Sequence, residues 1–551
     1  MHAGMATWRT LTQRADRQRD APTTAMPLPT DAAFVPHRRQ HASSLLLCCA
    51  TLMGGCALPP LDHRTESTAI TPAEAAATPL GRAVAAALAG HPGLSGIHPL
   101  NNAHAAFAAR IHLARTAQRT LDVQYYIWRN DLTGTLLLEA LHEAADRGVR
   151  VRLLLDDNGL SGMDELLAAM DAHPQVEVRI FNPFVLRQPK ALNFLTDFRR
   201  LNRRMHNKSF TADGVATIIG GRNVGDEYFG ATDGVLFADL DVIAIGPAAA
   251  DVAHDFDRYW TSASAYPVDR LVPPVSVERL HELAGSARAV EQNPAAGTYV
   301  AALREVPDVQ HMLNGTLEFE WAATRIVSDD PVKALGEASR DTLVAHQLRE
   351  ILGEPQRELD LVSPYFVPST AGTAYFSQLA EKGVAVRVLT NALEATDVAA
   401  VHSGYAKRRK ALLEAGVDLY ELRRSAAPAR KEDRAAGPFG SSGSSLHAKT
   451  FAVDASRVFV GSFNFDPRSA NLNTELGFVI DSPTLAGRIE STFATVVPQA
   501  AYQVKLDEQG KLYWLERRGD EVVRHDTEPN TSWWRRLGIW FLSILPIESM
   551  L

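Results

Sequence analysis

Two copies of one short pattern hold most of the residues in this sequence that could do chemistry. The pattern is H-x-K-x4-D, and its members are His206, Lys208 and Asp213 in the first copy and His447, Lys449 and Asp454 in the second. A Gly and an Asn follow each His at 14 and 17 residues: Gly220 and Asn223, then Gly461 and Asn464. Chance would supply on the order of 0.02 copies of the pattern in a chain of this composition. The chain is therefore internally duplicated.

The residue types in both copies suit the transfer of a phosphoryl group. A phosphodiester is negatively charged and resists attack, so catalysis needs a nucleophile, a proton for the leaving alkoxide and donors for the phosphate oxygens. Histidine can fill the first two roles, since a neutral imidazole attacks and a protonated one donates. Lys208 and Lys449 would supply charge, and Asn223 and Asn464 neutral donors. The sequence lacks the clustered carboxylates of a two-metal phosphodiesterase, so we expect no metal ion and no cofactor.

A carboxylate behind each histidine would fix its tautomer and stabilise the imidazolium. Glu475 and Asp239 are the candidates, because each precedes an apolar strand-like run that follows the Gly-x-x-Asn segment. Asp241 could replace Asp239, and both acids could instead be solvated strand ends. Asp213 and Asp454 lie five residues after the lysines, which suits capping of the following turn better than contact with phosphate. We interpret these two as structural.

The same order of predicted elements surrounds both copies. In the first copy, a helix, a strand, a helix and a strand are predicted at 102–117, 121–128, 134–147 and 149–155. In the second, a strand, a helix and a strand are predicted at 359–367, 372–382 and 384–389. Apolar, β-branched runs of this length suit buried parallel strands, so each copy contains a β-α-β unit. Each His-Lys segment then alternates polar and apolar residues and runs into a further strand, at 205–210 and 215–219 and at 446–451 and 458–460.

Length and composition describe an ordinary globular protein. The chain has 551 residues, of which 46% are hydrophobic and 22% charged, which is enough for two or three domains with full cores. The net charge of −8 argues against a nucleic-acid binder that relies on a broad basic surface. A local basic pocket is still allowed, because net charge says little about one cleft.

The three cysteines, Cys48, Cys49 and Cys56, all lie near the N-terminus. Charged residues at 37–39, an apolar stretch at 43–53 and a Gly-Gly-Cys ending have the order of a secretory signal peptide. The ending resembles a bacterial lipobox, in which Cys56 would be lipidated, and Met26 is an alternative start. Ala57 behind the cysteine resembles the outer-membrane sorting pattern. We therefore expect a leader at 1–56 and a flexible Pro-, Thr- and Ala-rich tether at 57–80.

Several strings carry a family resemblance. They are LDVQYYIW (121–128), RLNRRMHNKSF (200–210), GGRNVGDEYF (220–229), TDVAAVHSGYAKRR (396–409), SSLHAKTF (444–451), GSFNFDPRSANLNTELG (461–477) and the final LPIESML. Together they resemble the phospholipase D superfamily over about residues 95–500, and within it the C-type bacterial cardiolipin synthases. The resemblance implies an α/β fold with two pseudo-symmetric α/β/α sandwich units and an active site at their interface. We expect these units at 81–285 and 286–500, with a C-terminal tail at 501–551.

The resemblance also implies a function. It predicts a phosphatidyltransferase that makes cardiolipin from phosphatidylglycerol and a second phospholipid, such as phosphatidylethanolamine, through a phosphohistidine. By the same resemblance His206 attacks and His447 donates the proton. The alternatives are a hydrolase that releases phosphatidic acid, a phosphodiesterase that acts on nucleic acid, and a non-catalytic membrane scaffold. Acidic charge and membrane targeting disfavour the phosphodiesterase that acts on nucleic acid, and two intact motifs disfavour the non-catalytic scaffold.

The C-terminal residues 533–551 predict contact with a membrane. Two Trp and two Arg precede an apolar run of eleven residues, which is too short to span a bilayer but suits an interfacial helix. A helix docked on the protein's own core is the alternative. With the lipobox, this segment predicts a protein anchored in the bacterial cell envelope and facing the periplasm.

Other residues could line the site or could be ordinary packing or surface residues. They are Tyr125, Tyr126, Arg203, Arg204, Asp226, Glu227, His402, Tyr405 and Asp466. Residues 425–445 are rich in Ser, Gly and charge without periodicity, so we interpret them as a mobile loop beside His447.

Overall fold

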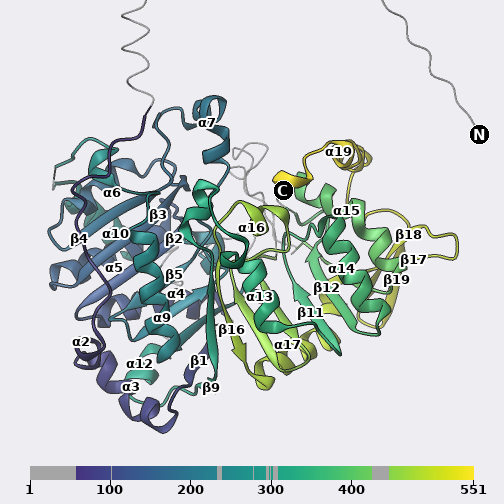
Figure 1. Ribbon diagram of the computed structural model, residues 1–551, viewed down its shortest axis with the longest axis horizontal. Helices are drawn as coiled ribbons and strands as arrows, with labels where there is room; N and C mark the ends of the chain where they lie inside the picture. The colour runs from purple at the N-terminus through teal and green to yellow at the C-terminus, as the bar shows by residue number, and fades with distance from the viewer. Residues whose placement is uncertain are drawn as a thin grey trace, which may run out of the picture. The chain divides into compact units, whose positions relative to one another are not determined.

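Two mixed β-sheets carry the two copies of the motif (Figure 1). The computed structural model describes residues 57–100, 102–231, 239–276, 278–292, 297, 300–301, 308–396, 398–424 and 446–551. The predicted signal peptide with its three cysteines and the predicted loop at 425–445 lie outside these residues. The described chain from Leu58 to Leu551 forms one unit.

The first sheet holds the first motif. Its strands are β1 (Ser95–Leu100), β2 (Thr120–Ile127), β3 (Arg150–Gly159), β4 (Val176–Phe181), β5 (Ser209–Ala212), β6 (Ala216–Gly220), β7 (Asp241–Ile245), β8 (Ala265–Pro267) and β9 (Glu320–Ala322). Within the described residues they follow the order β8-β4-β3-β2-β5-β6-β7-β1-β9.

The second sheet holds the second motif. Its strands are β10 (Thr324–Ser328), β11 (Glu358–Val362), β12 (Ala385–Asn391), β13 (Asp418–Leu422), β14 (Thr450–Val453), β15 (Arg457–Gly461), β16 (Leu476–Asp481), β17 (Ala501–Leu506), β18 (Leu512–Arg518) and β19 (Glu521–His525). In the described part of the chain they follow the order β10-β16-β15-β14-β11-β12-β13-β17-β18-β19.

The two sheets repeat one topology. Read from the other edge, the second sheet runs β17-β13-β12-β11-β14-β15-β16-β10, which matches β8-β4-β3-β2-β5-β6-β7-β1 strand for strand. The predicted β-α-β units are present, because β2 pairs with β3 and β11 pairs with β12 in parallel. The strands after each His-Lys segment pair antiparallel, β5 with β6 and β14 with β15. The predicted duplication of an α/β unit is confirmed.

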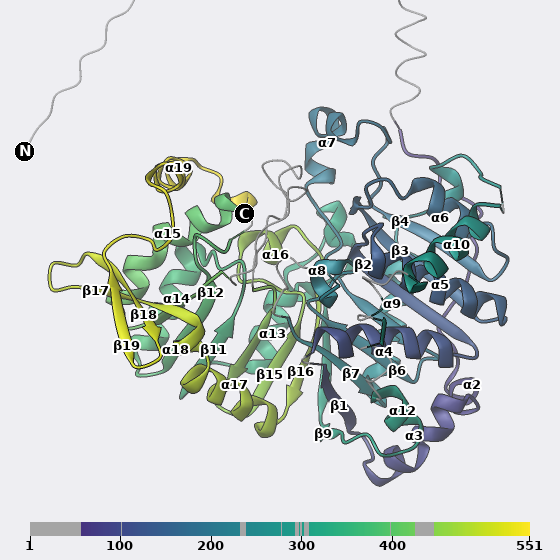
Figure 2. The same ribbon diagram turned by 180° about the vertical axis from the view of Figure 1, so that it is seen from behind.

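Helices cover both faces of each sheet (Figures 1 and 2). Those of the first half are α2 (Pro72–Ala76), α3 (Pro79–Gly90), α4 (Ala103–Thr116), α5 (Leu132–Asp146), α6 (Asp164–Asp171), α7 (Asn193–Leu201), α8 (Asp226–Phe229), α9 (Pro247–Trp260), α10 (Glu278–Gln292) and α12 (Asp308–Leu313). Those of the second are α13 (Val344–Leu352), α14 (Ser369–Glu381), α15 (Ala399–Glu414), α16 (Pro467–Asn471), α17 (Pro483–Thr495), α18 (Val497–Ala500) and α19 (Trp533–Ile544). In each half one long helix, α9 or α17, packs against the strands that follow the motif and contributes to the apolar cluster between the halves.

A shared apolar cluster joins the halves. It takes Ile219, Val242 and Val252 from β6, β7 and α9, and Val460 and Phe478 from β15 and β16, all of them nearly inaccessible to water. Burial of apolar surface stabilises by about 25 cal/mol per Å², so a cluster of this kind contributes to holding the two halves together. The motif strands of the two halves therefore meet along the middle of the unit.

The division between the halves differs from the sequence-based prediction. We expected the first unit to end at 285, but β9 still pairs with β1 in the first sheet and β10 pairs with β16 in the second. The chain therefore crosses between sheets at Ala323. Residues 501–525 were assigned to a separate tail, yet β17 pairs with β13 and extends the second sheet into the β18–β19 hairpin.

The segment at 57–80 is not a free tether in its described residues. Arg64 donates to the carbonyl oxygens of Ser262 and Ala265, at 2.7 and 3.0 Å. The carbonyl of Ser67 accepts a hydrogen bond from Arg152 at 2.9 Å, and the amide of Ala69 donates to Asp257 at 2.7 Å. Composition indicated flexibility, but these long-range hydrogen bonds fix the segment along the first half.

Candidate active site

A backbone bridge between the halves places the first motif. The amide of His206 donates to the carbonyl of Thr474 at 2.9 Å, and the amide of Thr474 donates to the carbonyl of Arg204 at 2.9 Å. The predicted strand at 205–210 therefore begins only at Ser209, because His206 pairs outward with the second half. The side chain of Thr474 adds a hydrogen bond to Asn207 at 2.8 Å.

Each histidine takes its carboxylate from the other half. Nδ1 of His206 lies 2.8 Å from Oε2 of Glu475, and Nδ1 of His447 lies 2.7 Å from Oδ2 of Asp239. Both acids are buried, so neither is a solvated strand end. Asp241 is engaged elsewhere, in an ion pair with Arg110 at 2.7 Å. The two carboxylates predicted from the sequence thus contact the two histidines, but crosswise.

The two lysines bring positive charge to the same place. Nζ of Lys208 donates to the carbonyl of His206 at 2.5 Å, and Nζ of Lys449 lies 2.9 Å from Nδ1 of His447. Burial and the nearby Lys449 ammonium lower the pKa of Lys208 to about 7. A phosphate anion would bind favourably here, because its negative charge relieves the repulsion between two buried ammonium groups.

The acid–base groups of the two pairs differ. Burial raises the pKa of Glu475 to about 7, although Lys208 opposes the shift. Burial also works against ionisation of Asp239, but the hydrogen bond with His447 and the positive charges of Lys449 and Arg222 hold the pKa of Asp239 below its usual range. Burial and the lysines lower the pKa of His206 well below its ordinary value and that of His447 to about 3. In this state both imidazoles are neutral, and only the one beside Asp239 has a fully ionised partner.

The turns that follow β6 in the first half and β15 in the second account for part of this difference in pKa between the two carboxylates. In the first half the turn has Gly221, where a Cβ would lie 2.2 Å from Oδ1 of Asp239. The second half has Ser462 at the same offset, and its hydroxyl donates to Oε2 of Glu475 at 2.5 Å. Because Gly221 has no side chain, the carboxylate of Asp239 can lie directly against the backbone of the turn, whereas Ser462 donates a hydrogen bond to Glu475.

An aromatic ring lies against each imidazole. The ring of Tyr126 is 5.1 Å from that of His206, edge to face, and the ring of Tyr228 is 5.1 Å from that of His447. Asn223 connects to this shell, because its Nδ2 donates to the Tyr228 hydroxyl at 3.1 Å and its Oδ1 accepts from the amide of Ile127 at 3.2 Å. Asn464 is likewise buried in the second motif.

Asp213 and Asp454 lie away from the histidines. Asp213 accepts hydrogen bonds from the amides of residues 118–120, the segment that enters β2. Asp454 accepts from the amides of residues 356–358, the segment that enters β11. Each carboxylate therefore holds the start of a neighbouring central strand, β2 or β11. The two aspartates are structural, as predicted, but they cap the start of that strand and not the turn that follows the motif.

The structure also places the residues that the sequence left open. Tyr125 is buried and accepts from Arg110 at 2.8 Å, and Arg204 pairs with Asp156 at 3.1 Å. His402 and Tyr405 are buried among Arg409, Glu421 and Glu528, so they lie in the core of the second half and not at its surface.

Sequence reasoning missed three residues at the site. Tyr228 is five residues after Asn223, and Ser462 is the position at which the two G-x-x-N turns differ. Arg468 in α16 donates to both the carbonyl and the side-chain oxygen of Asn202, and its charge contributes to lowering the pKa of His206. A comparison of the two copies position by position would have drawn attention to the first two.

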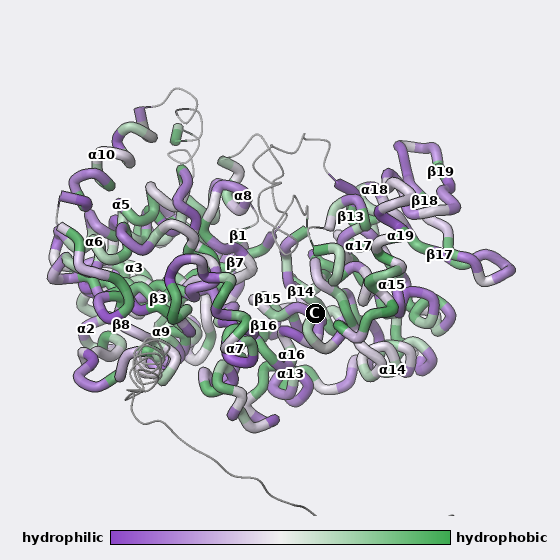
Figure 3. Tube along the Cα trace, turned by 90° about the horizontal axis from the view of Figure 1, so that it is seen from above, coloured by the Kyte–Doolittle hydropathy of each residue, from purple (hydrophilic) through white to green (hydrophobic). Residues whose placement is uncertain are grey.

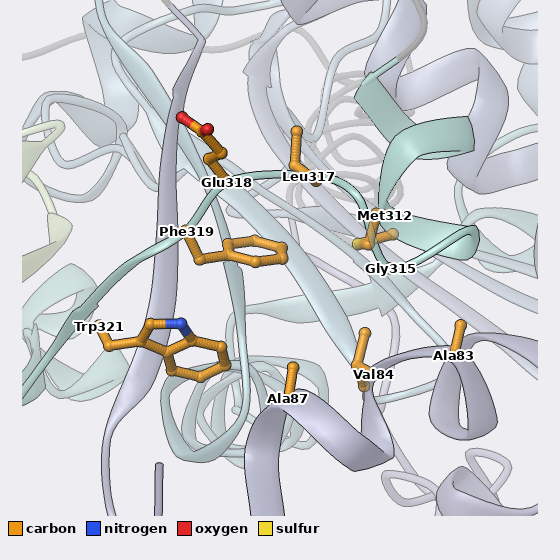
Figure 4. Close-up of a pocket in the computed structure, with 9 residues that line it drawn as sticks. All are labelled: Ala83, Val84, Ala87, Met312, Gly315, Leu317, Glu318, Phe319 and Trp321. Atoms are coloured by element: carbon orange, nitrogen blue, oxygen red, sulfur yellow. The ribbon is translucent and has the colours of Figure 1, made fainter. Parts of the chain in front are cut away.

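A pocket of about 480 Å³ lies elsewhere, where α3 meets α12 and the segment before β9 (Figure 4). Its lining includes Val84, Met312, Phe319 and Trp321, with Glu318 as the one acid among the lining residues. No motif residue lines it, so the chemistry described above does not use it.

Two duplicated α/β halves, with paired His, Lys and Asn residues meeting at their interface, define a phospholipase D-like phosphoryl-transfer protein. The family model described as "Cardiolipin synthase, PLD-like domain" matches residues 111–260 and again 348–497. The chain belongs to this family.

Similar proteins agree with the assignment. "Cardiolipin synthase C" of Escherichia coli (strain K12) is 49% identical over 468 residues, which cover 84% of this chain and 97% of that protein. An uncharacterized protein of Helicobacter pylori (strain ATCC 700392 / 26695) is 31% identical over 479 residues, 85% of this chain and 92% of its own length. The crystal structure of the phosphatidylserine synthase of Haemophilus influenzae Rd KW20 superposes with a TM-score of 0.53 at 14% identity, over 86% of this chain and 100% of that one. This last likeness concerns the fold alone.

Proposed function

We propose that this protein is a phosphatidyltransferase that makes cardiolipin from phosphatidylglycerol and a second phospholipid. The observation that carries the proposal is the crosswise pairing of two buried histidines with two carboxylates between two ammonium groups. The 49% identity to "Cardiolipin synthase C" supports this choice of substrates.

The chemistry needs two displacements at phosphorus. In the first, Nε2 of His206 attacks the phosphodiester, the bond from phosphorus to the headgroup oxygen breaks, and His447 gives its proton to the leaving alcohol. In the second, a hydroxyl of phosphatidylglycerol loses its proton to His447 and attacks the phosphorus, and the phosphorus–nitrogen bond breaks. The energy of the ester is kept in the phosphohistidine, so no nucleotide is needed.

The unequal carboxylates support this order of roles. A proton donor must become an imidazolium, which an ionised carboxylate stabilises, and Asp239 is held ionised beside His447. A nucleophile must stay neutral, which suits His206 beside Glu475, whose pKa is raised to about 7. The negative phosphate would raise the pKa of both histidines when it enters, and His447 has the partner that favours the proton there.

Membrane contact belongs to the same proposal. Six large apolar residues of α19 are exposed: Trp533, Trp534, Leu537, Trp540, Phe541 and Ile544. No helix among the described residues has the length and apolar character to cross a membrane. We propose that α19 lies in the bilayer interface, that Cys56 is a lipid anchor, and that the protein works in the cell envelope, where its phospholipid substrates are.

Product analysis tests the proposal. Purified protein is incubated with labelled phosphatidylglycerol, with and without phosphatidylethanolamine, and the lipids are separated by chromatography. Labelled cardiolipin is the expected product, and a larger yield with phosphatidylethanolamine would make that lipid a donor. Phosphatidic acid as the main product, with both lipids present, would identify water as the acceptor and replace transfer by hydrolysis.

A further inference from the structure

The segment before the first motif exposes apolar residues to water. On α7 and the loop before it, Leu195 is 82% exposed, and Leu186, Leu192 and Phe198 are between 44% and 50% exposed. Single exposed apolar residues are common on protein surfaces, but four within thirteen positions make a patch that calls for a partner. We name residues 186–198 the α7 patch.

The exposed residues of α19 form a comparable surface. They recur at helical spacing, so they fall on one side of the helix, whereas Ile539 on the other side is only 6% exposed and α19 lies against α15. Trp533 and Trp534 stack with ring centroids 3.5 Å apart. An amphipathic helix that turns its apolar side to solvent presents the reverse of the usual globular pattern.

Both surfaces lie on the same side of the molecule. α7 and α19 stand at the upper edge in Figure 1 and again after a half turn in Figure 2, and Figure 3 views the molecule from that side. Arg468 connects the end of α7 with the last residue of the chain, because its side chain donates to Asn202 and its amide donates to the carbonyl of Leu551 at 2.7 Å. The α7 end and the chain end are thus held by one residue beside His206.

The charge around the α7 patch indicates what covers it. Residues 186–204 contain six basic side chains and one acidic side chain, in a chain with net charge −8. Arg187, Lys190 and Arg204 pair with buried aspartates, and Arg200 pairs with Asp197. Arg199 and Arg203 have no carboxylate partner among the described residues, although Arg203 donates to the carbonyls of Lys333 and Asn471. Exposed leucine and phenylalanine beside such arginines match the acyl chains and anionic headgroups of a phospholipid bilayer.

We propose that the α7 patch is a second membrane-contact surface, which binds an anionic phospholipid bilayer together with the exposed side of α19. α7 ends at Leu201, five residues before His206, so a bilayer bound to α7 lies next to the first motif. Two contacts on opposite halves would hold the interface between the halves toward the membrane. This inference rests on the proposed use of phospholipid substrates, since it gives them a route to the site.

Vesicle binding tests the surface. We compare wild type, a Leu195→Gln/Phe198→Gln variant and a Val522→Gln variant on phosphatidylglycerol-containing vesicles by flotation. Val522 is a matched control, because it is 56% exposed and lies on the β18–β19 hairpin. The α7 variant should bind about tenfold more weakly, since two apolar side chains no longer enter the interface. The control should bind as wild type does, and turnover of monomeric short-chain phosphatidylglycerol should stay unchanged in both variants.

A second measurement does not depend on those substitutions. The cysteines of the chain are at 48, 49 and 56, so replacing them by serine allows a single cysteine to be labelled with a polarity-sensitive dye. On vesicles, label at Leu195→Cys and at Phe541→Cys should shift to shorter emission wavelengths, and label at Val522→Cys should not.

Unchanged vesicle affinity of the α7 variant, or no shift at position 195, would overturn the proposal. A loss of self-association without a loss of vesicle binding would also overturn it and would assign the patch to a second copy of the chain. If wild type binds vesicles through the α7 patch but forms no product from phosphatidylglycerol, the proposed phosphatidyltransferase function is refuted. The proposal that the α7 patch contacts membranes then still stands.

Discussion

The two histidines are chemically unequal although their motifs share the same H-x-K-x4-D pattern. Asp239 and Glu475 contact the same nitrogen of their respective histidines at nearly the same distance, yet only the pKa of Glu475 is raised. Sequence symmetry alone therefore cannot assign the nucleophile, and the surroundings of the two carboxylates favour His206.

Single substitutions of the histidines should separate the two roles. Either His206→Ala or His447→Ala should remove nearly all activity on the natural lipid, because each breaks one obligatory step. With a donor whose leaving group needs no proton, His447→Ala should still form a phosphoenzyme that turns over slowly, and His206→Ala should form none. Mass spectrometry of trapped protein locates the label. A phosphoryl group on His447 in the His206→Ala protein would reverse the assignment.

Acid should destabilise the protein through these same groups. Folded His447 has a pKa of about 3 against an ordinary 6.5, so between these values the unfolded chain binds a proton that the folded chain does not. The contribution of His447 to the free energy of unfolding is therefore full above pH 6.5. It decreases as the pH drops toward 3, by at most about 1.4 kcal/mol per pH unit. The unfolding midpoint of His447→Gln should depend less steeply on pH in that window. His254→Gln, at an exposed position on α9, should keep the wild-type slope, and equal slopes for the three proteins would refute the linkage.

Among the elements, the turns after β6 and β15 show how the space beside the backbone determines where a catalytic carboxylate can lie. Gly221→Ala would put a Cβ 2.2 Å from Asp239, so that carboxylate should leave His447 and activity should fall by roughly a hundredfold with the fold retained. Ser462→Gly is the matched exchange in the other half. It removes the hydrogen bond to Glu475 and the one accepted from the amide of Leu476, but it introduces no steric clash, so the loss of activity should be smaller. Turnover and unfolding midpoints of both variants test this ranking. A Gly221→Ala protein as active as wild type would show that Asp239 is free to move.

The C-terminal helix and Cys56 are expected to act as two separate anchors. Trp534→Gln/Trp540→Gln/Phe541→Gln removes apolar area from α19 while keeping Leu551 on Arg468. This variant and Cys56→Ser should each weaken sedimentation with membranes, and their combination should release the protein, since stable anchoring generally takes two signals. Release by Cys56→Ser alone would show that α19 contributes little.

Local sequence patterns predicted the positions of strands and helices better than they predicted which distant segments these elements contact. The β2–β3 and β11–β12 pairs follow from buried apolar runs separated by one helix, and both were predicted. The crossing at Ala323 was not, because short strands such as β9 and β10 take their identity from distant partners in two different sheets. The crosswise contact between Asp239 and His447 was missed for the same reason, since it joins residues 208 positions apart.

At the scale of the molecule, the charge in the site makes a further prediction. The two lysines already place two positive charges where a catalytic metal would act, so excess chelator should leave turnover unchanged. Assays with and without chelator, on protein freed of metals beforehand, measure this. Activity that disappears and returns with one divalent cation would require another mechanism.

The exchange of carboxylates between the halves has a consequence for how such a chain could arise and persist. A single ancestral half would hold a histidine without its acid, and it would need a twin, related by two-fold symmetry, to complete both pairs. Fusion of the two copies makes that association permanent and lets them diverge, as Gly221 and Ser462 have. Neither copy can decay alone, however, because each keeps a residue that the other requires.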